Sequence, residues 1–132
     1  MFNNRVDTHR ERIYILMFML AALAASGTAV AQVSPPSWTA SPDVYKVAAE
    51  NGQFRVIEGT WKPGQRDLLH SHPNGGFVYF VTDCILRLHS PDGTPEEVNR
   101  AAGAASSQPT FDSHWVENAG KETCKLVLFE PK

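Results

Sequence analysis

The chain after residue 44 consists of short apolar runs separated by turn residues, and this pattern constrains the fold more than any other feature. Residues 77–81 form the most strand-prone run, because every position carries an aromatic or β-branched side chain. Asn51-Gly52 and Pro63-Gly64 are typical turn pairs. The expected strands cover residues 44–49, 54–61, 68–72, 77–81, 84–89, 97–100, 115–118 and 124–129. Many short strands at this spacing predict an all-β sandwich or barrel.

The N-terminus has a different character. Three arginines precede residues 13–31, which carry no charge, begin with an apolar run and end in Ala29-Val30-Ala31. A basic start, an apolar stretch and an A-x-A end are typical of a secretory signal peptide. The alternative is an uncleaved membrane anchor, but the strongly apolar part is shorter than the roughly 20 residues that span a bilayer. We therefore predict cleavage after Ala31, a periplasmic or secreted protein, and no stable membrane anchor after cleavage.

The sequence predicts three consecutive parts of the chain. Residues 1–31 are the predicted signal peptide, and residues 32–44 form a proline-rich arm, either a linker or a segment that follows the edge of the domain. Residues 45–132 hold the predicted barrel. The chain is 42% apolar with a formal net charge of −2, values typical of a globular protein without the basic excess of a nucleic-acid-binding protein.

Two cysteines, Cys84 and Cys124, lie in the part expected to be exported. Each alternates with leucines along its predicted strand, so both sulfur atoms should point inward. An oxidising compartment favours a disulfide between them. The alternative is a pair of reduced, buried cysteines that act as small hydrophobic residues.

Histidines provide the clearest chemical signal. His70 and His72 are two residues apart on a predicted strand, which places both imidazoles on the same face. With a third histidine from elsewhere they can form an open metal site. The spacing alone is common by chance.

The context of these histidines resembles the two sequence motifs of the small single-domain bacterial cupins. Gly64, His70 and His72 match the first motif, and Gly103, Pro109, His114 and Asn118 match the second. The resemblance covers about residues 45–130 and implies a cupin-type antiparallel jelly-roll barrel. It also implies that His70, His72 and His114 bind one divalent transition metal inside the barrel. Imidazole ligands suit iron, copper, nickel or zinc, and manganese is a further possibility.

The chain departs from the family pattern at two positions. Gly76, or Phe77 with the longer motif spacing, stands where the motif has a glutamate ligand, and Phe111 replaces a turn glycine. Three neutral imidazoles would leave the full metal charge and more open positions than a site with a carboxylate. The same loss is expected of a degenerate, metal-free barrel. Three histidines without a carboxylate also resemble the iron thiol dioxygenases, which are longer chains.

Side chains alternate between the two faces of a strand, and this alternation predicts which further residues point into the barrel. Gly76, Val78 and Phe80 share a face and are expected to line the pocket. Arg66 shares the parity of the histidines and is expected to line the pocket too, where it could meet a substrate carboxylate. Asp67 has the opposite parity and is expected to point away. Asp112 is a possible acid or base. His89 matches no motif position and is expected to face solvent.

These observations leave three functions open: an exported metalloenzyme acting on a small organic acid or thiol, a non-catalytic binder of metal or small ligand, and a metal-free structural barrel. Whether the protein is an enzyme is left undecided by the sequence. The apolar outer face of residues 77–81, together with Trp115, predicts a homodimer.

Overall fold

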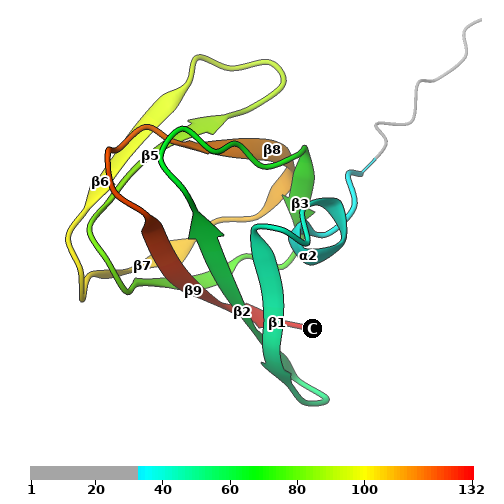
Figure 1. Cartoon of the computed structure of the whole chain (residues 1–132). Coiled ribbons are helices and arrows are strands. Elements are labelled where there is room, and N and C mark those ends of the chain that lie inside the picture. Colours follow the sequence, from blue (N-terminus) through cyan, green and yellow to red (C-terminus); the bar gives the residue numbers. More distant parts are fainter. Residues whose placement is uncertain (1–32) are drawn as a thin grey trace, which may run out of the picture. The chain divides into compact units, whose positions relative to one another are not determined.

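The computed structural model describes residues 33–132, and its strands form two antiparallel sheets that enclose a core (Figure 1). The elements in chain order are α2 (Ser37–Ala40), β1 (Tyr45–Glu50), β2 (Phe54–Trp61), β3 (His70–His72), β4 (Gly76–Phe80), β5 (Cys84–His89), β6 (Glu96–Arg100), β7 (Ala105–Gln108), β8 (Phe111–Asn118) and β9 (Cys124–Pro131). One sheet has the order β1-β2-β9-β4-β7 and the other the order β3-β8-β5-β6. Apart from the consecutive pairs β1-β2 and β5-β6, neighbours in both sheets are distant in sequence, as in a jelly roll. The predicted all-β, jelly-roll fold class is confirmed.

The core lies between the sheets and follows the alternation of the strands. On β9 the buried residues Cys124, Leu126 and Leu128 alternate with more exposed neighbours. Both sheets contribute to the core, which consists of Val44, Tyr45, Ile57, Trp61, Phe80, Cys84, Leu86, Val116, Cys124, Leu126 and Leu128. The inward face is therefore mostly apolar, with buried polar residues near the histidines and at Asn118.

A disulfide joins the two sheets. Cys84 on β5 and Cys124 on β9 are bonded, with an S–S distance of 2.03 Å. Both cysteines are buried, as their alternation with leucines predicts.

The proline-rich segment lies along the edge of β3. Pro36 forms a parallel bridge with Ser71, and the Ser71 amide donates a hydrogen bond to the Pro35 carbonyl. The Ser34 and Ser113 hydroxyls are 2.7 Å apart. These contacts cover the free edge of the strand that carries His70 and His72.

The sequence misplaces several boundaries. β3 covers only three residues, because residues 66–69 form a loop with an isolated bridge between Arg66 and Glu117. β7 was not expected, since its sequence is small and polar, but it pairs with β4. The predicted leader lies outside the described residues. Within residues 33–132 no helix has the length and apolar character needed to cross a membrane.

Candidate metal centre

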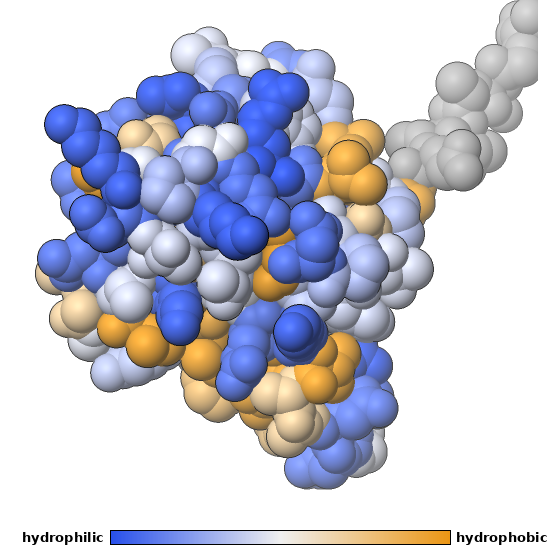
Figure 2. All heavy atoms as spheres, viewed as in Figure 1, coloured by the Kyte–Doolittle hydropathy of each residue, from blue (hydrophilic) through white to orange (hydrophobic). Residues whose placement is uncertain are grey.

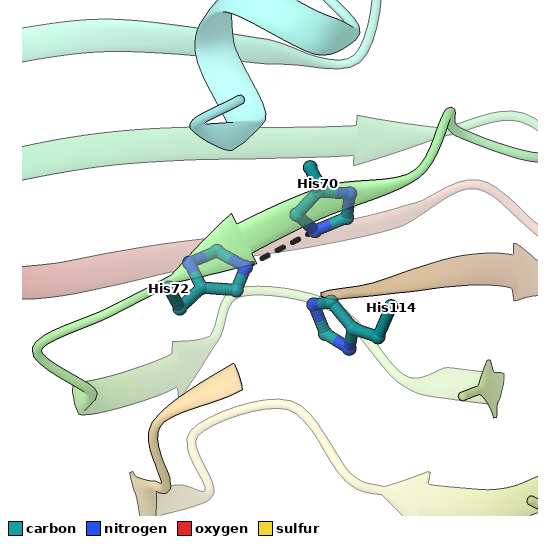
Figure 3. A group of neighbouring side chains, drawn as sticks. All are labelled: His70, His72 and His114. Atoms are coloured by element: carbon teal, nitrogen blue, oxygen red, sulfur yellow. Dashed lines mark hydrogen bonds between the residues drawn. The ribbon is translucent and has the colours of Figure 1, made fainter. Parts of the chain in front are cut away.

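Three buried histidines meet inside the barrel (Figure 3). His70 and His72 come from β3, and His114 comes from β8, where it pairs with His70 in the strand register. One ligand nitrogen of each imidazole lies within 4.8 Å of those of the other two. The Nε2 atoms of His70 and His72 are 3.1 Å apart. The structure thus brings together the three residues that the sequence predicted as ligands.

Hydrogen bonds determine which nitrogen of the β3 histidines is available. His70 Nδ1 lies 2.7 Å from the Leu68 carbonyl oxygen, and His72 Nδ1 lies 2.5 Å from Glu130 Oε1. A carbonyl can only accept a hydrogen bond, and an ionised carboxylate does the same, so each Nδ1 carries the proton. Each Nε2 then has a free lone pair, the arrangement found in metal-binding histidines.

His114 lacks such partners. Both of its ring nitrogens are buried and have no hydrogen-bond partner among the described residues. Its ring stacks on Phe111, with centroids 4.1 Å apart. Buried polar atoms without partners are unfavourable, so the site needs another group beside His114. A metal ion that accepts a lone pair from each histidine fits this requirement.

The protonation of the histidines supports the same interpretation. Burial lowers the pKa of His70 to about 4, although the hydrogen bond to Leu68 acts in the opposite direction. Burial, and then the neighbouring His70 and His72, lower the pKa of His114 to about 2. Both imidazoles are therefore neutral near pH 7, and a metal does not have to displace a proton from either of them.

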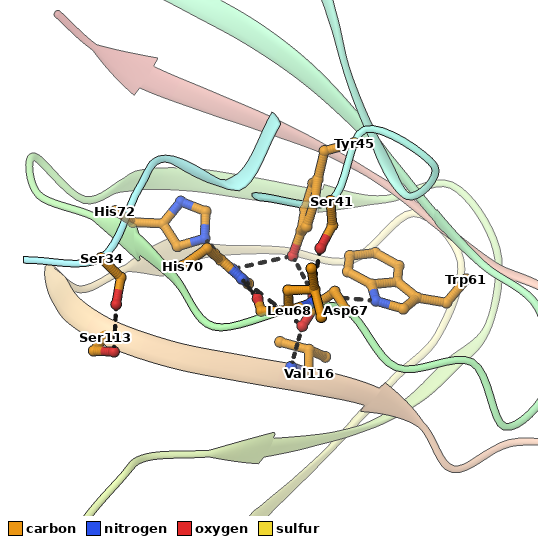
Figure 4. A network of polar contacts seen from close by, with 10 residues as sticks. All are labelled: Ser34, Ser41, Tyr45, Trp61, Asp67, Leu68, His70, His72, Ser113 and Val116. Atoms are coloured by element: carbon orange, nitrogen blue, oxygen red, sulfur yellow. Dashed lines mark hydrogen bonds and ion pairs between the residues drawn. The ribbon is translucent and has the colours of Figure 1, made fainter. Parts of the chain in front are cut away.

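Asp67 is part of this site, and the parity-based prediction that it points away is wrong (Figure 4). It is buried and accepts hydrogen bonds from the Tyr45 hydroxyl at 2.8 Å, from Trp61 Nε1 at 3.3 Å and from the Val116 amide at 2.6 Å. Its Oδ1 lies 3.7 Å from His70 Nδ1. Alternation does not apply to Asp67, because it lies in the loop before β3. Asp112 is exposed.

Sequence reasoning missed Tyr45 and Glu130. The Tyr45 hydroxyl lies 3.3 Å from His70 Nε2. Burial, and then the charge of Asp67, raise the pKa of Tyr45 well above 10, so the hydroxyl keeps its proton. Glu130 was missed because β9 was expected to end at residue 129. Its alternation with Leu126 and Leu128 was the signal that could have revealed it.

Gly76 cannot be replaced by the glutamate of the family motif in this backbone. Its φ is +140°, and a Cβ atom there would collide with the carbonyl oxygen of Phe129. The approach of β9 to Gly76 therefore excludes a glutamate side chain at this position. At the second departure, the Phe111 ring covers one face of His114.

A cavity of about 220 Å³ adjoins the cluster. His72 and His114 line it, as do Val78 and Phe80, which were assigned to the pocket from parity. Arg66 and Gly76 were assigned there too, but the lining does not include them. The Arg66 guanidinium instead lies over the Trp115 ring, 4.8 Å from its centroid, because residues 66–69 leave the strand. Gly76 has no side chain to project into the cavity.

Solved structures with a similar fold include cupins. A cupin domain from Bordetella pertussis Tohama I has a TM-score of 0.62 at 23% identity, covering 75% of this chain and 96% of that one. A cupin-like protein from Thermotoga maritima MSB8 has a TM-score of 0.51 at 22% identity, covering 68% and 73%. The polyketide cyclase RemF from Streptomyces resistomycificus has a TM-score of 0.53 at 20% identity, covering 74% and 68%.

These likenesses establish that the chain has the cupin fold, which its sequence motifs implied. The low identities carry no activity from one protein to another. No protein-family model matches the chain, and a search of curated proteins found no match either.

Proposed function

We propose that this protein binds one divalent transition metal through His70, His72 and His114 and uses it to hold a small molecule in the adjoining cavity. The observation that carries the proposal is that both buried nitrogens of His114 have no hydrogen-bond partner among residues 33–132, beside two imidazoles whose Nε2 lone pairs are free. The metal is iron, copper, nickel, manganese or zinc, the ions considered for imidazole ligands from the sequence.

Such a metal would act as a Lewis acid on whatever occupies the cavity. The chain's own groups prepare the site: Leu68 and Glu130 orient two imidazoles, and Asp67 fixes Tyr45 beside His70. We favour an exported small-molecule metalloenzyme of dioxygenase type, since only three protein ligands would leave positions on the metal open. One solved protein with this fold is a cyclase, so the fold is compatible with catalysis.

Metal content tests the proposal. The full chain, including its leader, would be expressed in a bacterium, purified from the periplasm without a metal-binding tag, and analysed by elemental mass spectrometry. We expect about one metal per chain, lost in His114→Ala and retained in the matched control His89→Ala. No metal in the parent protein, even after incubation with each of the five ions, would contradict the proposal and leave a structural barrel.

Turnover distinguishes the enzyme from a binder. Protein loaded with iron would be mixed with small organic acids and thiols while dissolved oxygen is recorded. Consumption that requires both the metal and one of these compounds supports the enzyme. Tight binding without oxygen consumption or any change in the compound would identify a non-catalytic binding protein.

Export and self-association are further parts of the proposal. Intact mass spectrometry of the periplasmic protein should give a chain that begins at Gln32. Phe77 on β4 and Phe129 on β9 pair across the outer face of the five-stranded sheet and are 64% and 44% exposed. In the view of Figure 2 the surface is mostly hydrophilic, with separate apolar areas along its lower side. We propose a homodimer through the Phe77–Phe129 face, which light scattering at tens of micromolar would refute by giving a monomer mass.

A further inference from the structure

Apolar side chains form most of the wall of the cavity beside the three histidines. Aliphatic and aromatic side chains from both sheets form most of it: Val78, Phe80, Leu86, Leu88, Val98, Phe111, Val116, Leu126 and Leu128. Glu96, Arg100 and Ser107 also line it, but all three are exposed and therefore lie at its opening. The remaining polar lining residues are Tyr45, His72, Ser106, Gln108 and His114. Polar groups placed among apolar ones restrict which ligand can bind.

Gln108 on β7 has a buried side-chain oxygen that lacks a hydrogen-bond donor among residues 33–132. It lines the cavity, and its Oε1 atom is buried without a hydrogen-bond partner among residues 33–132. In the strand register Gln108 lies directly opposite Gly76, the position of the missing carboxylate. A buried carbonyl oxygen without a partner costs free energy, and a donor from a bound molecule would remove that cost.

The size and charge of the site restrict the ligand further. A cavity of about 220 Å³ is smaller than the roughly 300–1,000 Å³ of pockets for drug-sized molecules. With only neutral imidazoles as protein ligands, the metal favours an anion from the ligand. The apolar wall requires a compact hydrocarbon body.

We propose that the cavity binds a small hydroxy acid with an apolar body, whose carboxylate binds the metal and whose hydroxyl donates a hydrogen bond to Gln108 Oε1. This inference rests on the proposed metal centre. Gln108 is then a specificity residue, which selects acids with a neighbouring hydroxyl over acids that lack one.

The test compares two acids that differ only in that hydroxyl. Mandelate and phenylacetate would be titrated calorimetrically into zinc-loaded protein purified from the periplasm, and zinc content would be measured in every sample. The parent protein should prefer mandelate. In Gln108→Leu, which is similar in size, the preference should fall about fivefold, the usual contribution of one hydrogen bond. The matched control Gln53→Leu changes an exposed glutamine and should keep the preference.

Each outcome decides a different claim. A parent protein that holds no zinc contradicts the metal centre itself. Zinc-loaded parent that binds neither acid, or binds both equally, overturns the ligand class. An unchanged preference in a folded, zinc-loaded Gln108→Leu protein overturns the role of Gln108. If that variant melts early, Gln108→Glu replaces it: a carboxylate there should weaken mandelate binding about tenfold by charge repulsion, and unchanged affinity would overturn the inference.

Discussion

Strand β8 contacts histidines on both of its faces. On the inner face, its own His114 meets His70 and His72, and neither ring nitrogen of His114 has a hydrogen-bond partner among residues 33–132. On the outer face, Trp115 stacks flat on His89 of β5, with ring centroids 3.5 Å apart. His89 is partly buried rather than solvent-facing as expected, and its Nε2, 3.7 Å from Glu117, also has no hydrogen-bond partner among these residues.

The inner and outer faces differ in whether several metal-ligand atoms point toward one another. The outer face gives His89 a flat ring contact and a single carboxylate. Within residues 33–132 the three inner histidines form the only group of three or more metal-binding side chains whose donor atoms converge. Strand parity, rather than the presence of a histidine, decides which imidazole can serve as a ligand.

Removing one of the three inner imidazoles should give the largest loss of zinc affinity. His72→Ala deletes a direct ligand, and we expect zinc affinity, measured by competition with a coloured chelator, to fall more than about a hundredfold, beyond the usual effect of losing a group behind a ligand. His89→Ala should leave the affinity unchanged. Equal losses in both variants would mean that the inner and outer histidines do not differ as described.

Each face also has a glutamate next to a histidine, and replacing these two glutamates should have a smaller effect on zinc affinity. Glu130→Gln still offers His72 Nδ1 an oxygen acceptor but removes its charge, so zinc affinity should fall about tenfold. Glu117→Gln, next to His89, should not change it. An unaffected Glu130→Gln protein would show that Glu130 only packs against His72.

The stability of the metal-free protein should depend on pH through the inner histidines. The folded pKa values of His70 and His114 lie below the ordinary value near 6.5, so the unfolded chain binds more protons. Their stabilisation is present above pH 6.5 and is lost as pH falls toward 4, by up to about 1.4 kcal/mol per pH unit for each histidine. Burial raises the pKa of Asp67 to about 6. Below pH 6 the folded protein therefore gains stability by protonating Asp67, which offsets the loss from one of the two histidines.

Urea unfolding at about pH 7.5 and pH 5 measures this difference. The parent protein should be less stable at pH 5, and His114→Gln should lose part of the dependence, while His89→Gln retains it. A stability that rises on acidification would show that the inner histidines are not buried in the neutral form.

The smallest expected effect comes from the stacking of His89 on Trp115. His89→Ala removes one aromatic contact with Trp115, and we expect a loss of about 1 kcal/mol in unfolding free energy with no change in metal content. Thermal unfolding with metal analysis of the same samples checks both. Loss of metal would give His89 a role that its outward position does not explain.

Much of the site could be predicted from the sequence because alternation holds within strands. His70 and His72 share a face and Val78 and Phe80 line the cavity, as a period of two requires. The rule gave the wrong direction for Asp67, whose loop backbone does not alternate.

Other contacts depend on packing that a local pattern does not contain. The assignment of Arg66 to the cavity failed for the same reason as that of Asp67. Tyr45 lies next to His70 only because the sheet order brings β1 and β3 to one end of the cavity, and Gln108 belongs to a strand whose polar sequence gave no sign of pairing.

Anomalous diffraction from crystals of the protein loaded with one equivalent of zinc tests the central claim most directly. The account predicts one peak above the zinc absorption edge, bonded to Nε2 of His70 and His72 and to one ring nitrogen of His114 at about 2.0–2.1 Å. A peak beside His89 and Glu117, or none inside the barrel, would contradict it.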